Sequence, residues 1–307
     1  LRKATDSIAL SDPSPAAVEF AKELGCPLVS NQEAVNNCDR LFLAVKPQVM
    51  KSVLTQIAPV LKERTEPFVL VSMAAGLTAA QIEDMAGGNL PVMRIMPNTP
   101  VAIGKGMTTY CHNSLVDKEQ LARLLSDLCH AGRFDRVEET QMDAATAAAG
   151  CSPAYAYMFI DAIAQGASTC GLPREKALQY AAAAVAGAAQ LLMESGEEPT
   201  ALRDAVCSPG GSTIAGVRVL EEMGFQGTVM DAIRAGNYKA LDRDTCKTPQ
   251  EREELMRQAL LSDTFLTSAN ALSLDGQMVN IDGNGNRVAA IVYGPRQVIV
   301  VAGMNKV

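Results

Sequence analysis

Short apolar runs alternate with helical patterns between residues 7 and 111, and this alternation constrains the fold more than any other feature. The runs are SIALS (7–11), RLFLAV (40–45), PFVLVSM (67–73) and VMRIM (92–96). Nearly continuous apolar strands that alternate with helices are typical of parallel sheets joined by right-handed crossovers. The sequence therefore predicts an α/β fold with a parallel sheet in this range.

Helices are expected between these strands. The first has Ser14 as its cap, Pro15 at its first position and Gly25 just after its end. The second runs through VMKSVLTQIAPVLKE (49–63), and a short third helix begins at Thr78.

Three distinctive loops follow the strands at 40–45, 67–73 and 92–96. In a doubly wound sheet, ligands bind at the carboxyl ends of the strands. Asn98 and Thr99 in the third loop offer an amide and a hydroxyl between two prolines. Singly, each loop is more typical of a tight strand-to-helix turn, but three on one sheet edge favour a dinucleotide site. Small residues leave room there for a flat cofactor: Ala44, Ala74, Ala75 and Gly76.

Residues 139–235 have a different character, because they are rich in alanine and helical throughout. Glycines punctuate the region at Gly150, Gly171, Gly196 and Gly210. The stretch QYAAAAVAGAAQLLM (179–193) carries small residues on all faces, which allows close helix packing and suggests a helical dimer interface. Low-complexity disorder is the weaker alternative, given the leucines and the glycine stops.

Within this region, VCSPGGSTIAGVRVLE (206–221) brings two glycines and three hydroxyls to the beginning of a helix. Such a loop leaves backbone N–H groups unpaired at the positive end of the helix dipole, which suits a carboxylate or a phosphate. An ordinary N-cap, with Ser208 or Ser212 capping and Pro209 stiffening the turn, explains these residues equally well.

The pattern changes again after about Gly236. Asp-Gly and Gly-Asn turn signals separate apolar runs in 266–307, which predicts hairpins and a final buried strand. The strand at 297–302 has two candidate placements. It docks beside 40–45, where an absent first strand would leave an unpaired edge, or it belongs to a separate small subdomain, the placement that we favour.

Composition excludes several classes of function. The net charge of −7 and the pI near 5.0 argue against nucleic acid as a partner. No apolar run is long enough to span a membrane. Eight cysteines without a Cys-x-x-Cys pair suit a reducing cytoplasm. The two histidines, His112 and His130, stand apart from every motif, so we expect neither a histidine-centred triad nor a zinc site.

Six motifs in one order carry a resemblance to a known family: AVKPQ, SMAAG, MPNTP, SPAY (152–155), GLPRE (171–175) and SPGGSTIAG (208–216). Residues 1 to about 235 resemble the pyrroline-5-carboxylate reductase family. The resemblance implies a Rossmann domain over 1–138 that lacks its first βα unit, followed by a helical dimerisation domain over 139–235. It also implies a cytoplasmic homodimer with a shared active site, which reduces 1-pyrroline-5-carboxylate to L-proline with NADPH or NADH in the last step of proline biosynthesis.

Site residues follow from the same resemblance. The substrate carboxylate would bind the loop formed by Ser208, Gly210, Gly211 and Ser212, and the catalytic Thr213 would hydrogen-bond the imine nitrogen. Glu139 would be an acid near the substrate, with a solvated position as its alternative. Asp12 could bind a ribose hydroxyl or begin the turn before Pro13. The cofactor would contact Ser11, Asn31, Ala44, Val45, Lys46, Pro47, Ala74, Ala75, Gly76 and Asn98.

The sequence departs from the family at three places. It begins at Leu1 without a Gly-x-Gly-x-x-Gly loop, so an N-terminal truncation is one explanation. The usual Ser-Gly-Ser-Gly-Pro-Ala reads Ala-Gly-Cys-Ser-Pro-Ala at 149–154, and an asparagine before the glycine loop is Ala205. Two further hypotheses follow: a dimeric reductase-like scaffold that binds cofactor weakly, and a related imine or hydroxyacid reductase.

The C-terminal residues 236–307 resemble a fragment of the lactate-utilisation (LUD) family. The similar stretches are GNYKALDRD (236–244), LTSANALSLDG (266–276), NIDGNGNRVAA (280–290) and YGPRQVIVVAGMNKV (293–307). This part is expected to be a small β-rich segment whose polar side chains are turn and sheet residues: Asn270, Asp282, Asn286 and Arg287.

Overall fold

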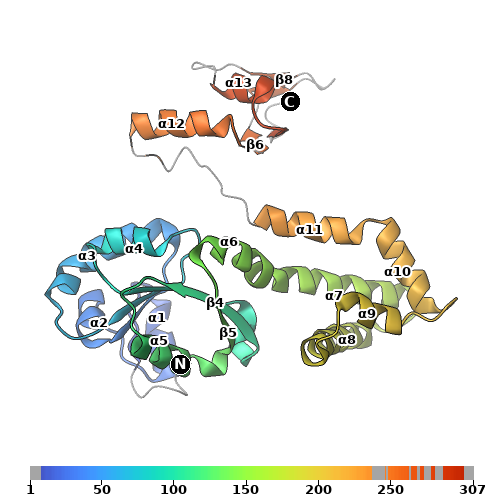
Figure 1. The fold of residues 1–307 in the computed structure, drawn as a ribbon, viewed down its shortest axis with the longest axis horizontal. Helices are drawn as coiled ribbons and strands as arrows, with labels where there is room; N and C mark the ends of the chain where they lie inside the picture. Colours follow the sequence, from blue (N-terminus) through green and yellow to red (C-terminus); the bar gives the residue numbers. More distant parts are fainter. Residues whose placement is uncertain are drawn as a thin grey trace. The chain divides into compact units, whose positions relative to one another are not determined.

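The structure is a computed structural model that describes residues 8–236 and, beyond them, 246, 248–262, 264–267, 270–272, 278–280 and 286–300. The chain divides into two compact units, Leu1–Tyr238 and Lys239–Val307. Figure 1 shows the sheet and the helices of the first unit, and the helices and strands of the smaller second unit.

A five-stranded sheet forms the centre of the N-terminal region, in the order β1-β2-β3-β4-β5. The parallel pairing predicted for β1 (Arg40–Leu43), β2 (Val69–Ser72) and β3 (Val92–Met96) is confirmed. In contrast, β4 (Gly106–His112) runs antiparallel to β3, and β5 (Gly132–Arg136) is parallel to β4. The reversal has a simple cause. Only the 3₁₀ turn η1 (Thr99–Ile103) lies between β3 and β4, which is too short for a crossover helix.

The expected helices are present around this sheet. Gly25 ends α1 (Ala16–Leu24) in the left-handed conformation, and a capping box at Thr78 begins α4 (Ala79–Ala86). The helix α1 begins one residue later than predicted, at Ala16, but Pro15 has helical angles and the Ser14 hydroxyl accepts from the Ala16 N–H at 3.3 Å, as a cap does. The segment predicted as a first strand contributes one parallel bridge, Leu10 to Leu28, and its Ser7 lies outside the described residues. The other helices and turns here are α2 (Asn31–Asn37), α3 (Pro47–Glu63), α5 (Lys118–Asp127) and η2 (Cys129–Ala131).

Two apolar layers cover the two faces of the sheet. Leu54 and Ile57 of α3 pack in one cluster with Leu70, while Val69 and Val71 belong to the opposite cluster with Leu124 of α5. Successive residues of β2 therefore point to opposite faces, and both faces are buried. This double covering holds the carboxyl ends of β1, β2 and β3 at one edge.

The helical region follows the sheet, as predicted. Gly171, Gly196 and Gly210 adopt left-handed angles between helices, whereas Gly150 lies inside a continuous π-helical turn and ends no helix. The successive elements are η3 (Glu139–Gln141), α6 (Met142–Ala145), η4 (Thr146–Cys151), α7 (Ser152–Thr169), α8 (Arg174–Ser195), α9 (Pro199–Ala205), α10 (Ser212–Glu222) and α11 (Phe225–Gly236).

The second unit combines helices and strands, so the expectation of a β-rich segment needs correction. The predicted hairpin is present, because β7 (Ala271–Leu272) and β8 (Met278–Val279) pair antiparallel. The unit also contains α12 (Pro249–Ala259) and α13 (Asn286–Tyr293). The last described strand, β9 (Gln297–Val300), pairs in parallel with β6 (Thr264–Thr267), and the hairpin and α13 lie between them in the chain.

The less favoured placement, in which 297–302 docks beside 40–45, is therefore wrong. β9 pairs with β6, and β1 has β2 as its neighbour in the described sheet. Val298 and Val300 are half-buried, so this strand is less enclosed than expected, and residues 301–302 lie outside the described residues.

The polar residues expected in turns and sheets of the tail need one further correction. Asn286 is the first residue of α13 and Arg287 is the second, so both are helical and neither lies in a turn or a strand. Arg287 donates to the Asn270 side chain at 2.7 Å, which ties α13 to the hairpin. Asp282 lies outside the described residues. Across the part of the chain that the structure describes, no helix has the length and apolarity needed to cross a bilayer.

Candidate active site

The loops after β1 and β2 form an open edge lined by small groups. The Met73 N–H donates to the Leu43 carbonyl at 3.3 Å, which holds the two strand ends together. Ala74 is buried, whereas Ala44, Lys46, Pro47 and Ala75 are exposed and Val45 is half-buried.

Gly76 completes this edge with a left-handed φ of 74° and empty space where a Cβ would stand. An L side chain would be strained there and would project into the open edge. The small residues of the loops leave open space at this edge, and their contact with a flat nucleotide stays a prediction.

Asn98 ties the third loop to the rest of the fold. Its Oδ1 accepts from the Met107 N–H at 2.9 Å, and its Nδ2 donates to the Ala149 carbonyl at 3.0 Å. Ala149 lies in the π-helical turn η4, where the wider hydrogen-bonding pattern changes which carbonyls are paired. Asn98 therefore anchors the start of the helical region to the sheet edge, a role that sequence reasoning did not assign.

The two other residues assigned to the cofactor lie next to each other. The Ser11 hydroxyl donates to Asn31 Oδ1 at 2.8 Å, and Asn31 Nδ2 donates to Gln56 Oε1 of α3 at 3.0 Å. Asp12 accepts from the Ser14 N–H at 2.7 Å, which is the turn-forming geometry of its alternative interpretation.

The loop before α10 begins its helix without a side-chain cap. Gly211 is the N-cap residue and no side chain caps the helix, so the alternative in which Ser208 or Ser212 caps it is wrong. A Cβ on Gly211 would lie 2.5 Å from Ser208 Oγ, and Gly210 has a left-handed φ of 71°. Both glycines are thus required by the turn, one for space and the other for its backbone angle.

An uncapped helix start leaves the first backbone N–H groups available to a ligand. Elsewhere in the described chain, α2, α4, α5 and α12 begin with a side-chain cap and a capping box, whereas α3, α7, α8 and α9 have no side-chain cap. The start of α10 is therefore distinguished by its two glycines and its exposed hydroxyls, and not by the missing cap alone. In α10, Ser212 and Thr213 occupy the first turn and are exposed. The positive end of the helix dipole and the free N–H groups favour an anion at this loop.

Glu139 makes contacts that the sequence did not predict. Its Oε1 accepts from the Ala79 N–H at 2.7 Å and pairs with Arg94 Nη1 at 3.0 Å. The Arg94 side chain is only 5% exposed, against 38% for Glu139. Among residues 8–236, no recorded hydrogen bond or ion pair joins Glu139 to the loop at 208–212. The sequence did contain one signal for this contact: Arg94 is a single charge inside the apolar strand VMRIM, and a buried charge needs a partner.

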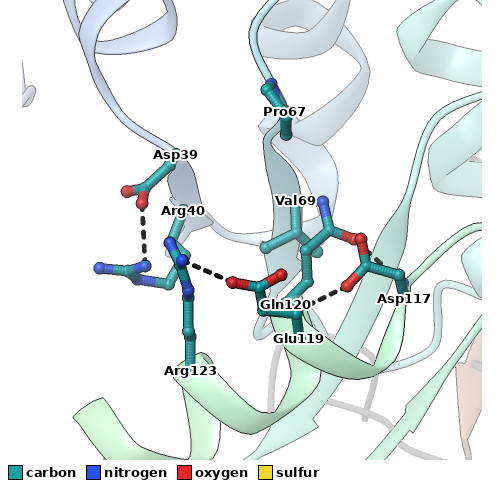
Figure 2. A pocket seen from close by; sticks show the side chains of 8 residues that line it. All are labelled: Asp39, Arg40, Pro67, Val69, Asp117, Glu119, Gln120 and Arg123. Carbon is teal, nitrogen blue, oxygen red and sulfur yellow. Dashed lines mark hydrogen bonds and ion pairs between the residues drawn. The ribbon is translucent and has the colours of Figure 1, made fainter.

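A shallow pocket lies at the opposite, amino end of the sheet (Figure 2). Asp39 and Arg40 enter it from the start of β1, and Asp117 lies just before α5. The remaining lining residues are Pro67, Val69, Glu119, Gln120 and Arg123.

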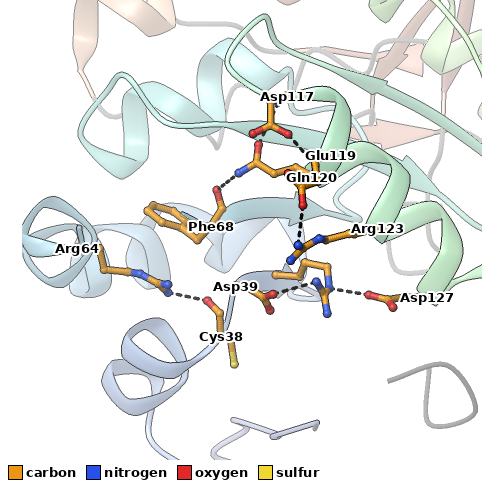
Figure 3. A network of polar contacts seen from close by, with 10 residues as sticks. Cys38, Asp39, Arg64, Phe68, Asp117, Glu119, Gln120, Arg123 and Asp127 are labelled. Carbon is orange, nitrogen blue, oxygen red and sulfur yellow. Dashed lines mark hydrogen bonds and ion pairs between the residues drawn. The ribbon is translucent and has the colours of Figure 1, made fainter. Parts of the chain in front are cut away.

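The charged groups of this pocket are paired within the fold, as Figure 3 shows. Arg40 binds Asp39 at 3.0 Å and Asp127 at 2.7 Å, and Arg123 binds Glu119 at 2.6 Å. The Arg40–Asp127 pair fastens α5 to the start of β1, and the other two pairs are local, so we interpret the pocket as structural.

Comparison with known proteins gives two family matches. Residues 139–242 match the model described as pyrroline-5-carboxylate reductase dimerisation. Residues 3–76 match the model described as NADP oxidoreductase, coenzyme F420-dependent. The two matches cover most of the sheet edge and the whole of the loop before α10.

Curated relatives and solved structures are consistent with these matches. The chain is 41% identical over 208 residues to a pyrroline-5-carboxylate reductase of Corynebacterium melassecola, covering 68% of this chain and 77% of the relative. A 1-pyrroline-5-carboxylate reductase structure from Streptococcus pyogenes has a TM-score of 0.70 at 34% identity, covering 76% of this chain and 89% of that chain. A Plasmodium falciparum pyrroline carboxylate reductase with NADP bound has a TM-score of 0.68 at 29% identity, covering 80% and 86%.

Proposed function

Because the chain belongs to the pyrroline-5-carboxylate reductase family, we infer that it reduces 1-pyrroline-5-carboxylate to L-proline with NADPH or NADH. The observation that carries this inference is the identity of about 40% to curated reductases over two thirds of the chain. The matched family model includes the uncapped glycine loop, where the chain offers an anion site of its own.

The cofactor belongs at the carboxyl edge of β1, β2 and β3. Ala44–Pro47, Ala74–Gly76 and Asn98 would line it, with Ser11 and Asn31 beside them. When bound, NAD(P)H supplies the hydride that reduces the C=N bond. The protein contributes a small-residue edge that admits the flat ring and fixed loops that orient it.

The substrate carboxylate belongs at the start of α10. Backbone N–H groups of the loop at Ser208–Ser212 would bind it, supported by the helix dipole. Thr213 would hydrogen-bond the imine nitrogen and orient the ring. A threonine hydroxyl is a weak acid, so it positions the nitrogen or relays a proton instead of being the proton's source.

A homodimer completes this arrangement. Large apolar side chains are exposed along α7, α8 and α10, among them Tyr157 at 62%, Leu191 at 56% and Val219 at 57%. Clustered exposure of large apolar side chains is typical of a surface that a partner covers. A second copy of the chain, as the dimerisation family model suggests, would cover these faces.

The test is substrate-dependent oxidation of NADPH by the protein and by Thr213→Ala. We expect the variant to fold normally and to lose about tenfold to a hundredfold in kcat, because misplacing a reacting group has effects of this size. Thr55→Ala is the matched control. Thr55 is exposed on α3 and donates only to the Lys51 carbonyl of its own helix, so turnover should stay unchanged.

Two results would contradict the proposal. If the unmodified protein binds NADPH but does not oxidise it with 1-pyrroline-5-carboxylate, the assigned reaction is wrong. If Thr213→Ala turns over like Thr55→Ala, the reaction stands and the role given to Thr213 is wrong.

A further inference from the structure

One carboxylate connects three parts of the first unit. Glu139 belongs to η3 at the entry to the helical region, Arg94 to the middle of β3, and Ala79 to the first turn of α4. A single oxygen, Oε1, accepts from both Arg94 Nη1 and the Ala79 N–H. The contact therefore joins the helical region to the sheet and to α4 at once.

The contact with Ala79 fixes the end of the loop proposed to line the cofactor. Residues 74–78 lead directly from β2 into α4, and Ala79 is the first residue of that helix. The Thr78 side chain already caps Gln81, so Glu139 satisfies a different N–H of the first turn. A carboxylate at a helix N-terminus is also favoured by the helix dipole.

The contact with Arg94 makes the position of Glu139 rigid. Arg94 pairs in register with Ser72 of β2 and Cys111 of β4, so its backbone is held on both sides. A buried guanidinium needs a compensating charge, and removing that charge leaves it unpaired at high cost. Arg94 thus anchors Glu139 to the sheet, and Glu139 in turn anchors α4.

We propose that Glu139 is a positioning residue for the nicotinamide cofactor. Its carboxylate holds the start of α4, and with it the loop Ala74–Gly76, in the shape that the dinucleotide contacts. The proposal rests on the proposed function only in assigning the cofactor to this edge. It differs from the prediction that Glu139 lies near the substrate.

The decisive variant removes both charges together. Arg94→Met with Glu139→Met leaves no unpaired buried charge, so the fold should survive, but Ala79 loses its acceptor. We expect the Kd for NADPH, measured by fluorescence titration, to rise about tenfold or more, as for loss of a hydrogen bond to a charged group. Hydrogen–deuterium exchange of the amides at 76–80 should become faster in the absence of cofactor. The KM for the imine should stay unchanged.

Two companion variants test the acceptor itself. Arg94→Met with Glu139→Gln keeps a side-chain oxygen for the Ala79 N–H without charge, so NADPH affinity should recover most of the loss. Glu119→Ala is the matched control, because it breaks a Glu–Arg pair with Arg123 at the other end of the sheet. It should leave the Kd for NADPH unchanged.

The outcomes separate this proposal from the proposed function. Unchanged NADPH affinity and unchanged exchange at 76–80 in the double methionine variant would overturn the positioning role. A higher KM for the imine with unchanged NADPH affinity in that variant would overturn the positioning role in favour of a substrate contact. Absence of NADPH binding by the unmodified protein would also overturn the positioning role. If NADPH binds and Glu139 controls its affinity but the imine is not reduced, only the reaction assignment fails.

Discussion

The sheet region and the helical region use similar apolar side chains in opposite ways. Around the sheet, Met50, Leu54 and Leu70 are completely buried. Between residues 152 and 236, all of which the structure describes, the buried side chains are the alanines Ala164, Ala177 and Ala181. The larger apolar side chains of that region are exposed or only half-buried, as Leu191 and Ile160 show. The difference indicates that the sheet builds its core from one chain, whereas the helices need another surface to cover them.

The largest expected effect comes from the sheet core. Leu70→Ala removes a completely buried side chain of β2 and should lower the free energy of unfolding by about 2–5 kcal/mol. Because this core is complete within one chain, the loss should be the same at low and high protein concentration. Urea denaturation at two concentrations measures it. A loss that depends strongly on concentration would mean that the sheet region also relies on a partner.

A charge placed in the helical region should instead change association. Leu191 of α8 is 56% exposed, so Leu191→Glu creates no strain within one chain. In the proposed dimer this substitution would bury an unpaired carboxylate. We therefore expect the dissociation constant of the dimer to rise about tenfold or more, which corresponds to a loss of ~1.4 kcal/mol in the free energy of association. Sedimentation velocity over a dilution series gives this constant.

Leu115 provides the matched control for this experiment. It is 42% exposed in the sheet region, before α5. Leu115→Glu should leave the dissociation constant unchanged. An equal effect of both substitutions, or a monomer in the unmodified protein at all concentrations, would contradict the comparison between the two regions.

Local patterns predicted the elements whose causes are local. The parallel strands β1 to β3, the helix α3 and the glycine that ends α1 follow from periodicity and from backbone preferences of single residues. The helix α12 also had a local signal, because Thr248 and Glu251 form a capping box with Pro249 between them. The prediction for the tail did not use this signal, since it relied on the turn residues.

Features that depend on distant residues could not be predicted in this way. Glu139 and Arg94 are 45 residues apart, and nothing in either neighbourhood specifies that they meet. The same holds for Asn98 and the carbonyl of Ala149, which are 51 residues apart. The uncapped start of α10 is a different case. Serines at 208 and 212 are chemically able to cap, and the sequence alone did not show that Gly211 would take the N-cap position instead.

The smallest expected effect compares two serines at two helix starts. In the sheet region, Ser30 accepts from the Glu33 N–H at 3.2 Å, and Glu33 Oε2 accepts from the Ser30 N–H at 2.8 Å. Ser30→Ala removes half of this capping box and should lower the free energy of unfolding by about 1 kcal/mol, without affecting catalysis. Ser212 begins α10 but caps nothing, so Ser212→Ala should change the free energy of unfolding by less than about 0.5 kcal/mol.

Because Ser212 belongs to the proposed substrate loop, its loss should raise the KM for the imine. Urea denaturation and steady-state kinetics on both variants measure the two effects side by side. Equal destabilisation by the two substitutions would show that Ser212 caps α10 as Ser30 caps α2, and the N–H groups at the start of α10 would then no longer be free for a ligand.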